Sequence, residues 1–204
     1  MAKKDWLPPC FKDLNAALLA NVEASRGLSY SLRETDSGSY YVYGLLRAAS
    51  KFKLANSIVG IEYNDYVVAT QRQYTAQIRL MAAFVAFESF ARLRGGAWFD
   101  LAGVSAGRYA TEAQNIQSCI TESSLLELKA FMAADALKER IDRYLDGDLS
   151  EVFAVACAMR NGFAHGLYGS RGQFYKSALK LRPLILKCIE DQISADVAIV
   201  QRAH

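Results

Sequence analysis

The range 71–94 is the part of this sequence that most constrains the fold. No proline or glycine interrupts it before the Gly95-Gly96 pair. Its apolar side chains recur at the spacings of an α-helix, at Tyr74, Ile78, Met81, Val85 and Phe87. From position 81 to position 87 the sequence is apolar nearly all round, which is typical of a helix with neighbours on several sides. The sequence therefore predicts a long helix at the centre of the protein.

Helical patterns also precede and follow this central helix. They cover 11–24, 40–54, 110–118, 121–145, 149–165 and 173–201. Thr121, Ser123 or Ser124 is suited to cap the helix over 121–145, and Ser150 is suited to cap the next one. Pro183 predicts a kink or a boundary within the last helix.

The segments between these helices are less regular. The range 25–39 is polar and predicts a connection, and 95–107 predicts a loop anchored by Trp98 and Phe99. The range 57–70 contains two β-branched and aromatic clusters on either side of Asn64-Asp65. That pattern fits a small β-hairpin, and it fits irregular structure leading into the central helix equally well.

These elements predict an all-α protein: an antiparallel bundle of four to five core helices with an N-terminal helical extension. The core helices are those at about 71–94, 121–145, 149–165 and 173–201, and short connections favour antiparallel neighbours. We expect residues 1–70 to form a helical elaboration that packs on a bundle formed by residues 71–204.

The composition narrows the class of protein without naming a function. A hydrophobic fraction of 52% argues against disorder. Lys and Arg number 24 against 21 Asp and Glu, and a net charge of +3 permits nucleic-acid binding without requiring it. The four cysteines form no CxxC pair and there are only two histidines, so zinc-ligand spacing is absent and we expect neither a metal nor a cofactor.

The sequence also indicates where in the cell the protein is expected. No apolar run approaches the ~20 residues of a membrane span. The first residues lead into Pro8-Pro9 rather than into the apolar core of a signal peptide. We therefore expect a cytoplasmic protein that does not enter a membrane.

The candidate for chemistry is the range 160–166, with the sequence Arg-Asn-Gly-Phe-Ala-His-Gly. It holds His165, and the second histidine of the chain is the last residue, His204. Histidine is the side chain whose ordinary pKa suits proton transfer near neutral pH. Asn161 and His165 are four residues apart and therefore neighbours on one helix face. Gly166 suits the left-handed position just past a helix end, so His165 is expected in the last turn.

These residue types together suit a phosphate group. The guanidinium of Arg160 presents a planar fork of donors to phosphate oxygens. His165 can transfer protons, and Asn161 can orient the imidazole or donate to a substrate. A purely structural interpretation remains open, because an arginine and a capping histidine at a helix C-terminus favour the helix dipole without any catalysis.

This arrangement resembles the Arg-x4–6-His motif of the HEPN superfamily (higher eukaryotes and prokaryotes nucleotide-binding). The motif arginine, the polar residue after it and the histidine match Arg160, Asn161 and His165. Glu88 in the central helix matches an acidic residue that often supports the site in that family. The resemblance covers roughly 71–201, with the motif late in the chain and one helix after it.

The resemblance implies a metal-independent endoribonuclease, in a toxin–antitoxin or anti-phage defence role. Cleavage by 2′-hydroxyl attack needs a base, an acid and positive charge at the phosphate. One chain supplies one useful histidine, and HEPN ribonucleases typically dimerise with their motifs facing one another. The expected partners are therefore RNA, a second copy through the helix carrying Arg160 and His165, and an antitoxin protein.

Two other functions stay open. The chain can be a non-catalytic HEPN-like module that binds a nucleotide or a partner, or a structural helical protein whose motif match is accidental. Tyr168, Arg171 and Lys176 follow the motif and are candidates for binding the substrate, with Tyr168 stacking on a base. They can equally be ordinary surface residues of a turn.

Overall fold

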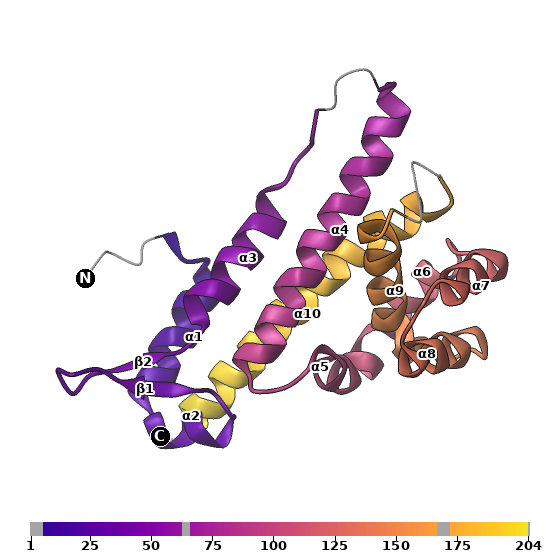
Figure 1. The fold of residues 1–204 in the computed structure, drawn as a ribbon. Coiled ribbons are helices and arrows are strands. Elements are labelled where there is room, and N and C mark those ends of the chain that lie inside the picture. The colour runs from indigo at the N-terminus through magenta and orange to yellow at the C-terminus, as the bar shows by residue number, and fades with distance from the viewer. Residues whose placement is uncertain (1–5, 63–65, 167–171, 204) are drawn as a thin grey trace.

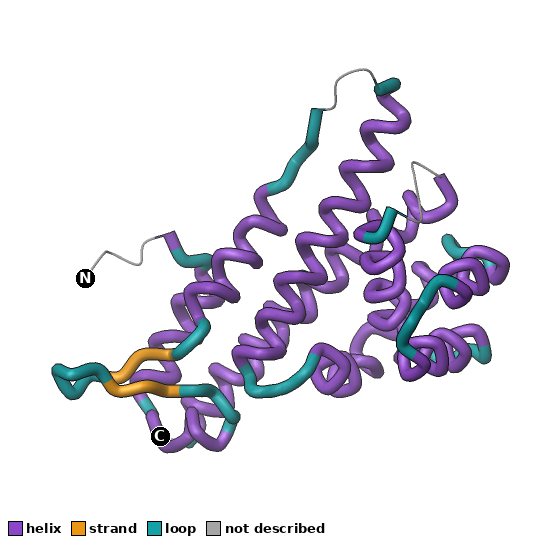
Figure 2. Tube along the Cα trace, viewed as in Figure 1, coloured by secondary structure: helices purple, strands orange, loops and turns teal. Residues whose placement is uncertain are grey.

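The computed structural model of the chain describes residues 6–62, 66–166 and 172–203. The helices are α1 (Pro9–Ala20), α2 (Val22–Gly27), α3 (Leu45–Ser57), α4 (Val68–Leu93), α5 (Trp98–Ser105), α6 (Ala110–Gln117), α7 (Glu122–Ala130), α8 (Asp135–Leu145), α9 (Val152–Ala164) and α10 (Tyr175–Arg202). The described strands are β1 (Leu32–Glu34) and β2 (Tyr40–Val42). The predicted all-α class is confirmed as a helical bundle with one small hairpin (Figures 1 and 2).

The predicted central helix is confirmed as α4. It is 26 residues long, which corresponds to roughly 39 Å, and it packs against α3, α9 and α10. Figure 1 shows α3, α4 and α10 as long rods beside one another, with α5 to α9 gathered on one side. Leu80, Phe84, Phe87 and Phe90 are fully buried around its circumference, which explains why its sequence is apolar nearly all round.

The direction of each neighbouring helix relative to α4 depends on how much chain connects the two. α3 and α4 are consecutive and antiparallel, and Lys51 of α3 donates to the Ser89 hydroxyl of α4 at 2.8 Å. α9 is antiparallel to α4, because the ring of Phe153 stacks on Phe87 while Phe163 contacts Tyr74. α10 runs in the same direction as α4, since α5 to α9 intervene between them and return the chain to the same end (Figure 1).

The N-terminal helices share the core of the bundle. The ring of Phe11 in α1 lies 5.5 Å from that of Phe52 in α3 and 6.2 Å from that of Phe90 in α4. One cluster of buried apolar side chains extends from Leu7 to Val200. The division into 1–70 and 71–204 stays a prediction. The buried apolar core is continuous across that boundary.

A buried carboxylate fastens one end of the bundle. Asp196 of α10 is fully buried and accepts two bonds from the guanidinium of Arg94, at 2.8 and 3.1 Å. It also accepts a bond from Tyr30 at 2.6 Å and one from Gln192 at 2.9 Å. Burial, followed by the charge of Asp196, raises the pKa of the Tyr30 hydroxyl well above its usual value, so Tyr30 stays a donor.

The prediction of one helix over 121–145 is wrong. The chain forms α7 and α8 with a turn at 131–134, although no proline or glycine lies in that turn. Both helices pack against α9 and against each other. A straight helix of that length would extend roughly 37 Å, far beyond the roughly 20 Å of the 13-residue α9, so folding back is what lets both halves bury their apolar faces on it.

A hairpin forms in a part of the chain where the sequence analysis predicted none. Leu32 pairs with Val42 and Glu34 with Tyr40, in the range where a polar connection and a helix start were predicted (orange in Figure 2). Gly44 has a φ of 85° and separates β2 from α3, which is why the predicted helix over 40–54 begins only at Leu45. In the described parts of 57–70 there is no strand, so the irregular alternative applies there.

Three smaller differences concern helix ends. The predicted helix over 11–24 breaks at Asn21, whose side chain accepts a bond from the backbone of Ala24 and begins α2. The predicted loop over 95–107 contains α5 and a 3₁₀ turn. α10 continues through Pro183 without ending. None of the described helices is both long and apolar enough to cross a membrane.

The Asp196 network should contribute strongly to stability. We expect Asp196→Ala to lower the free energy of unfolding by about 3–5 kcal/mol, because the guanidinium of Arg94 loses its buried partner. Urea unfolding followed by circular dichroism measures the change. Glu23→Ala, which removes the exposed partner of Arg26, is the control and should cost less than about 1 kcal/mol. Equal losses in the two variants would contradict the assignment.

Candidate functional site

The candidate range 160–166 lies at the end of α9, where the helix passes from the buried core to the surface. Every residue from Val152 to Met159 is buried, whereas Arg160 and Asn161 are partly exposed and His165 is exposed. The start of the helix is held by Glu151, a buried carboxylate that pairs with Arg140 at 2.9 Å and with Arg143. The body of α9 is therefore anchored, and its last turn presents polar side chains at the surface.

Arg160 is held in place by three contacts. One terminal nitrogen forms an ion pair with Glu88 of α4, and the other donates to the Asn161 side chain at 2.9 Å. The guanidinium carbon lies 5.2 Å from the centre of the Phe84 ring. The Arg160 and Glu88 side chains are each 23% exposed, so the pair is partly shielded from water and still reachable from it.

His165 is the C-cap residue of α9. Its backbone N–H bonds the carbonyl of Asn161 at 3.0 Å, and Gly166 follows with a φ of 69°. The expected helix end with a left-handed glycine is thus confirmed. An exposed imidazole at this point can exchange protons with a bound molecule.

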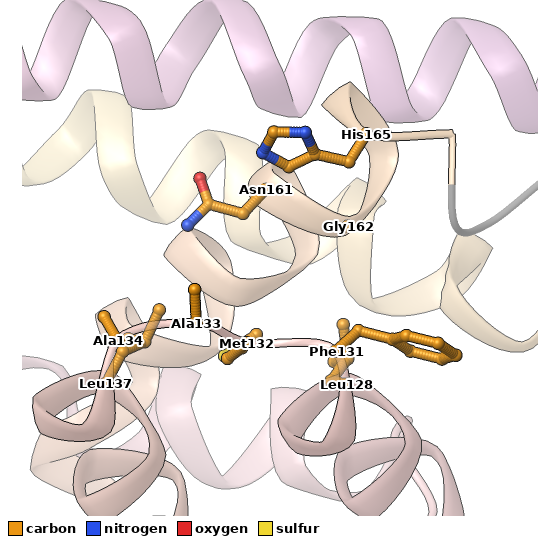
Figure 3. A pocket seen from close by; sticks show the side chains of 9 residues that line it. All are labelled: Leu128, Phe131, Met132, Ala133, Ala134, Leu137, Asn161, Gly162 and His165. Atoms are coloured by element: carbon orange, nitrogen blue, oxygen red, sulfur yellow. The ribbon is translucent and has the colours of Figure 1, made fainter.

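Asn161 connects the ion pair to the histidine. Its side-chain oxygen accepts the bond from Arg160, and its side chain lines a pocket together with Gly162 and His165. Figure 3 shows the Asn161 and His165 side chains extending to the same side of α9, with the turn between α7 and α8 on the far side of the pocket. Arg160 is not part of this pocket wall, and no hydrogen bond joins it to His165 in the described chain.

The opposite wall of the pocket is apolar. It is formed by Leu128, Phe131, Met132, Ala133, Ala134 and Leu137 (Figure 3). Phe131 is 53% exposed, so this wall presents an aromatic ring to solvent. The volume is about 180 Å³, below the 300–1,000 Å³ or so of sites that enclose a small-molecule ligand. One chain by itself therefore offers a small notch, with less volume than a site that encloses a small-molecule ligand.

Cys157 lies one turn before Asn161, with its sulfur 3.9 Å from the Asn161 amide nitrogen. Burial raises the pKa of its thiol to about 11. The thiol is therefore protonated at neutral pH and does not act as a nucleophile in this site.

The structure brings together part of the predicted set. Glu88, Arg160 and Asn161 form one connected group, and His165 adjoins it through Asn161. Lys176 is exposed in the first turn of α10. Tyr168 and Arg171 lie outside the described residues.

Sequence reasoning missed two contributors. Phe84 precedes Glu88 by one helical turn, and that spacing was a usable signal for a ring beneath the arginine. The turn containing Phe131 gave no signal, because it lies inside a pattern that reads as continuous helix.

No group of three or more His, Cys, Asp and Glu side chains in the described part of the chain is placed to hold a metal ion. Comparison of the sequence with protein-family models and with curated proteins, and of the fold with solved structures, finds no match.

The ion pair between Glu88 and Arg160 can be measured separately from any activity. A double-mutant cycle with Glu88→Gln and Arg160→Met should give a coupling energy of about 1–3 kcal/mol, because the pair is charged and partly buried. Urea unfolding of the four proteins provides the values. The same cycle on Glu112 and Lys187, an exposed pair between α6 and α10, is the matched control and should give a clearly smaller coupling. Equal couplings would mean that the Glu88 pair is no better held than a surface pair.

Proposed function

We propose that this chain is a metal-independent endoribonuclease of the HEPN type, which cleaves RNA at a site composed from two copies of the chain. The observation that carries the proposal is the connected group of Glu88, Arg160 and Asn161 beside the exposed His165. A phosphate-binding guanidinium and a proton-transferring imidazole are what cleavage by 2′-hydroxyl attack requires.

The chemistry divides between the two copies. One His165 takes the proton from the 2′-hydroxyl as its oxygen forms a bond to phosphorus. The His165 of the second copy gives a proton to the 5′-oxygen as the bond between phosphorus and that oxygen breaks. The products are a 2′,3′-cyclic phosphate and a 5′-hydroxyl. Arg160 stabilises the charge on the phosphate oxygens in the transition state.

The contacts of Arg160 suit this role. Glu88 and Asn161 each occupy one terminal nitrogen, which fixes the guanidinium in one orientation before RNA binds. Each terminal nitrogen carries a second hydrogen, so donors remain for a phosphate oxygen. Fixing the side chain in advance lowers the entropy lost when substrate binds.

The geometry of the notch supports a dimer. A pocket of about 180 Å³ with one imidazole is too small and has one proton-transferring group too few for the reaction. The exposed Phe131 and the neighbouring Ala133 and Ala134 offer apolar surface on its rim. A second copy related by a two-fold axis would cover this surface and supply the second His165 and Arg160.

The biological role follows from the resemblance alone. We propose that the protein acts in the cytoplasm as a toxin of a toxin–antitoxin system or as an anti-phage effector, with an antitoxin protein as its partner. One observation favours the alternative of a structural helical protein. The charge of Arg160 is already paired with Glu88, and such a pair can simply hold α9 on α4.

Cleavage should depend on the motif and not on a metal. We expect purified protein to cleave total RNA in the presence of a chelator, and His165→Ala to slow cleavage about 10²–10⁴-fold. Arg160→Ala should have a similar effect, while Arg26→Ala, on the exposed surface of α2, is the control and should leave the rate unchanged. Gel electrophoresis of the products measures the rate. Cleavage by His165→Ala at the wild-type rate would refute the mechanism.

The dimer should depend on the rim of the notch. We expect Phe131→Asp to convert a dimer into a monomer and to abolish RNA cleavage, because a charge at the centre of an apolar contact is costly to bury. Leu54→Asp, at another exposed apolar position, is the matched control and should remain dimeric and active. Sedimentation equilibrium gives the mass, and circular dichroism checks the fold. A fully active Phe131→Asp monomer would contradict a composite site.

A further inference from the structure

A second pocket lies against a different part of α4. It is bounded by α4, by the start of α10 and by the segment 59–62 that follows α3, and its volume is about 460 Å³. That volume lies within the range of about 300–1,000 Å³ of small-molecule sites, and the pocket has the form of a groove that is open to solvent. His165, Arg160 and Glu88 do not line it, so it is separate from the notch at the end of α9.

Arg79 of α4 is the unusual residue of this pocket. Its Nε atom is buried without a hydrogen-bond partner, as are those of Arg160 and Arg182, but no hydrogen bond or ion pair of its terminal nitrogens is found within the described chain either. In the described chain, neither Arg79 nor Arg72, two turns earlier on the same helix, forms an ion pair with any carboxylate. A partly buried guanidinium without a partner is costly, so its presence needs an explanation.

Arg182 of α10 makes the position of Arg79 less favourable still. Its guanidinium donates to the carbonyls of Ala55 at 2.9 Å and Asn56 at 3.3 Å, at the end of α3. Burial and the positive charge of Arg79 both lower the pKa of Arg182. Arg79 therefore adds unfavourable positive charge to the surroundings of Arg182, and neither guanidinium forms an ion pair in the described chain. The bonds to the end of α3 account for the partly buried position of Arg182. No contact of the described residues accounts for the partly buried position of Arg79.

We infer that this pocket binds the phosphate group of a nucleotide, with Arg79 and Arg72 as its anion-binding side chains. A phosphate placed there would supply the missing partner for Arg79 and relieve its repulsion with Arg182. The inference concerns binding alone and does not depend on the proposed ribonuclease activity.

The remaining walls suit the rest of a nucleotide. Tyr175 and Ile61 provide aromatic and apolar surface on which a base can lie. Glu62 provides a carboxylate that can accept hydrogen bonds from ribose hydroxyls. The Thr75 hydroxyl lies between the two arginines along α4 and bonds the backbone of Ile61 at 3.3 Å, which ties the segment 59–62 to the helix.

Calorimetry with the full-length chain tests the inference. We expect AMP to bind, inorganic phosphate to compete with it, and adenosine without phosphate to bind at least about tenfold more weakly. Arg79→Met should weaken AMP binding at least about tenfold, because it removes the guanidinium and keeps an apolar stem of similar length. Arg92→Met, an exposed arginine near the far end of α4, is the matched control and should bind AMP like the wild type.

A stability measurement separates a binding residue from a structural one. Without ligand, Arg79→Met should have an unfolding midpoint equal to or above that of the wild type, because it removes a buried unpaired donor and a like-charge contact. AMP should raise the midpoint of the wild type and not that of Arg79→Met. His165→Ala should keep full AMP binding, so failure of the ribonuclease proposal would leave this result unchanged.

Three outcomes would overturn the inference. They are no AMP binding by the wild type, equal AMP binding by the wild type and Arg79→Met, and a lowered midpoint of Arg79→Met without ligand. Binding of a short single-stranded RNA that is lost in Arg79→Met, without any binding of AMP, would also reject a nucleotide site in favour of an RNA backbone contact.

Discussion

The bundle depends on one buried carboxylate, Asp196, which joins three separate parts of the chain. Its four hydrogen bonds come from Tyr30 before the hairpin, from Arg94 at the end of α4 and from Gln192 within α10. A buried charge is tolerated only when its hydrogen-bonding capacity is satisfied, so these groups must meet in one arrangement. That requirement sets the register of α10 along α4. α9 packs on the same α4 and presents its last turn beside it.

The sequence predicts best those helices whose extent is determined by their own residues. α4 and α10 have long uninterrupted periodicity, and the end of α9 has a glycine in a left-handed conformation. The break between α7 and α8 could not be predicted, because its cause is the length of α9, a partner distant in the fold. The hairpin at 32–42 was not predicted, because its strands are three residues each, too short for a period-two pattern to show.

The part of the candidate site that lies on one helix could be predicted from residue spacing. The spacing of four residues placed Asn161 and His165 on one face, and both line the same pocket. The pairing of Glu88 with Arg160 connects two helices, and spacing along one helix carries no information on the register between them. Only the resemblance to HEPN proteins singled out Glu88. The apolar wall with Phe131 was missed together with the turn that carries it.

Arg160 and Arg79 are two arginines of the same bundle whose guanidinium groups have different surroundings. The guanidinium of Arg160 has a carboxylate, an amide and an aromatic ring around it, so its charge is compensated before any ligand arrives. A phosphate that approaches it must share the guanidinium with Glu88, which lowers affinity but keeps the geometry fixed throughout a reaction. Arg79 forms no ion pair in the described chain, so an anion bound there would not have to compete with a carboxylate of the protein for it. The first arrangement suits a catalytic group that must release its product, and the second suits a group whose task is to bind.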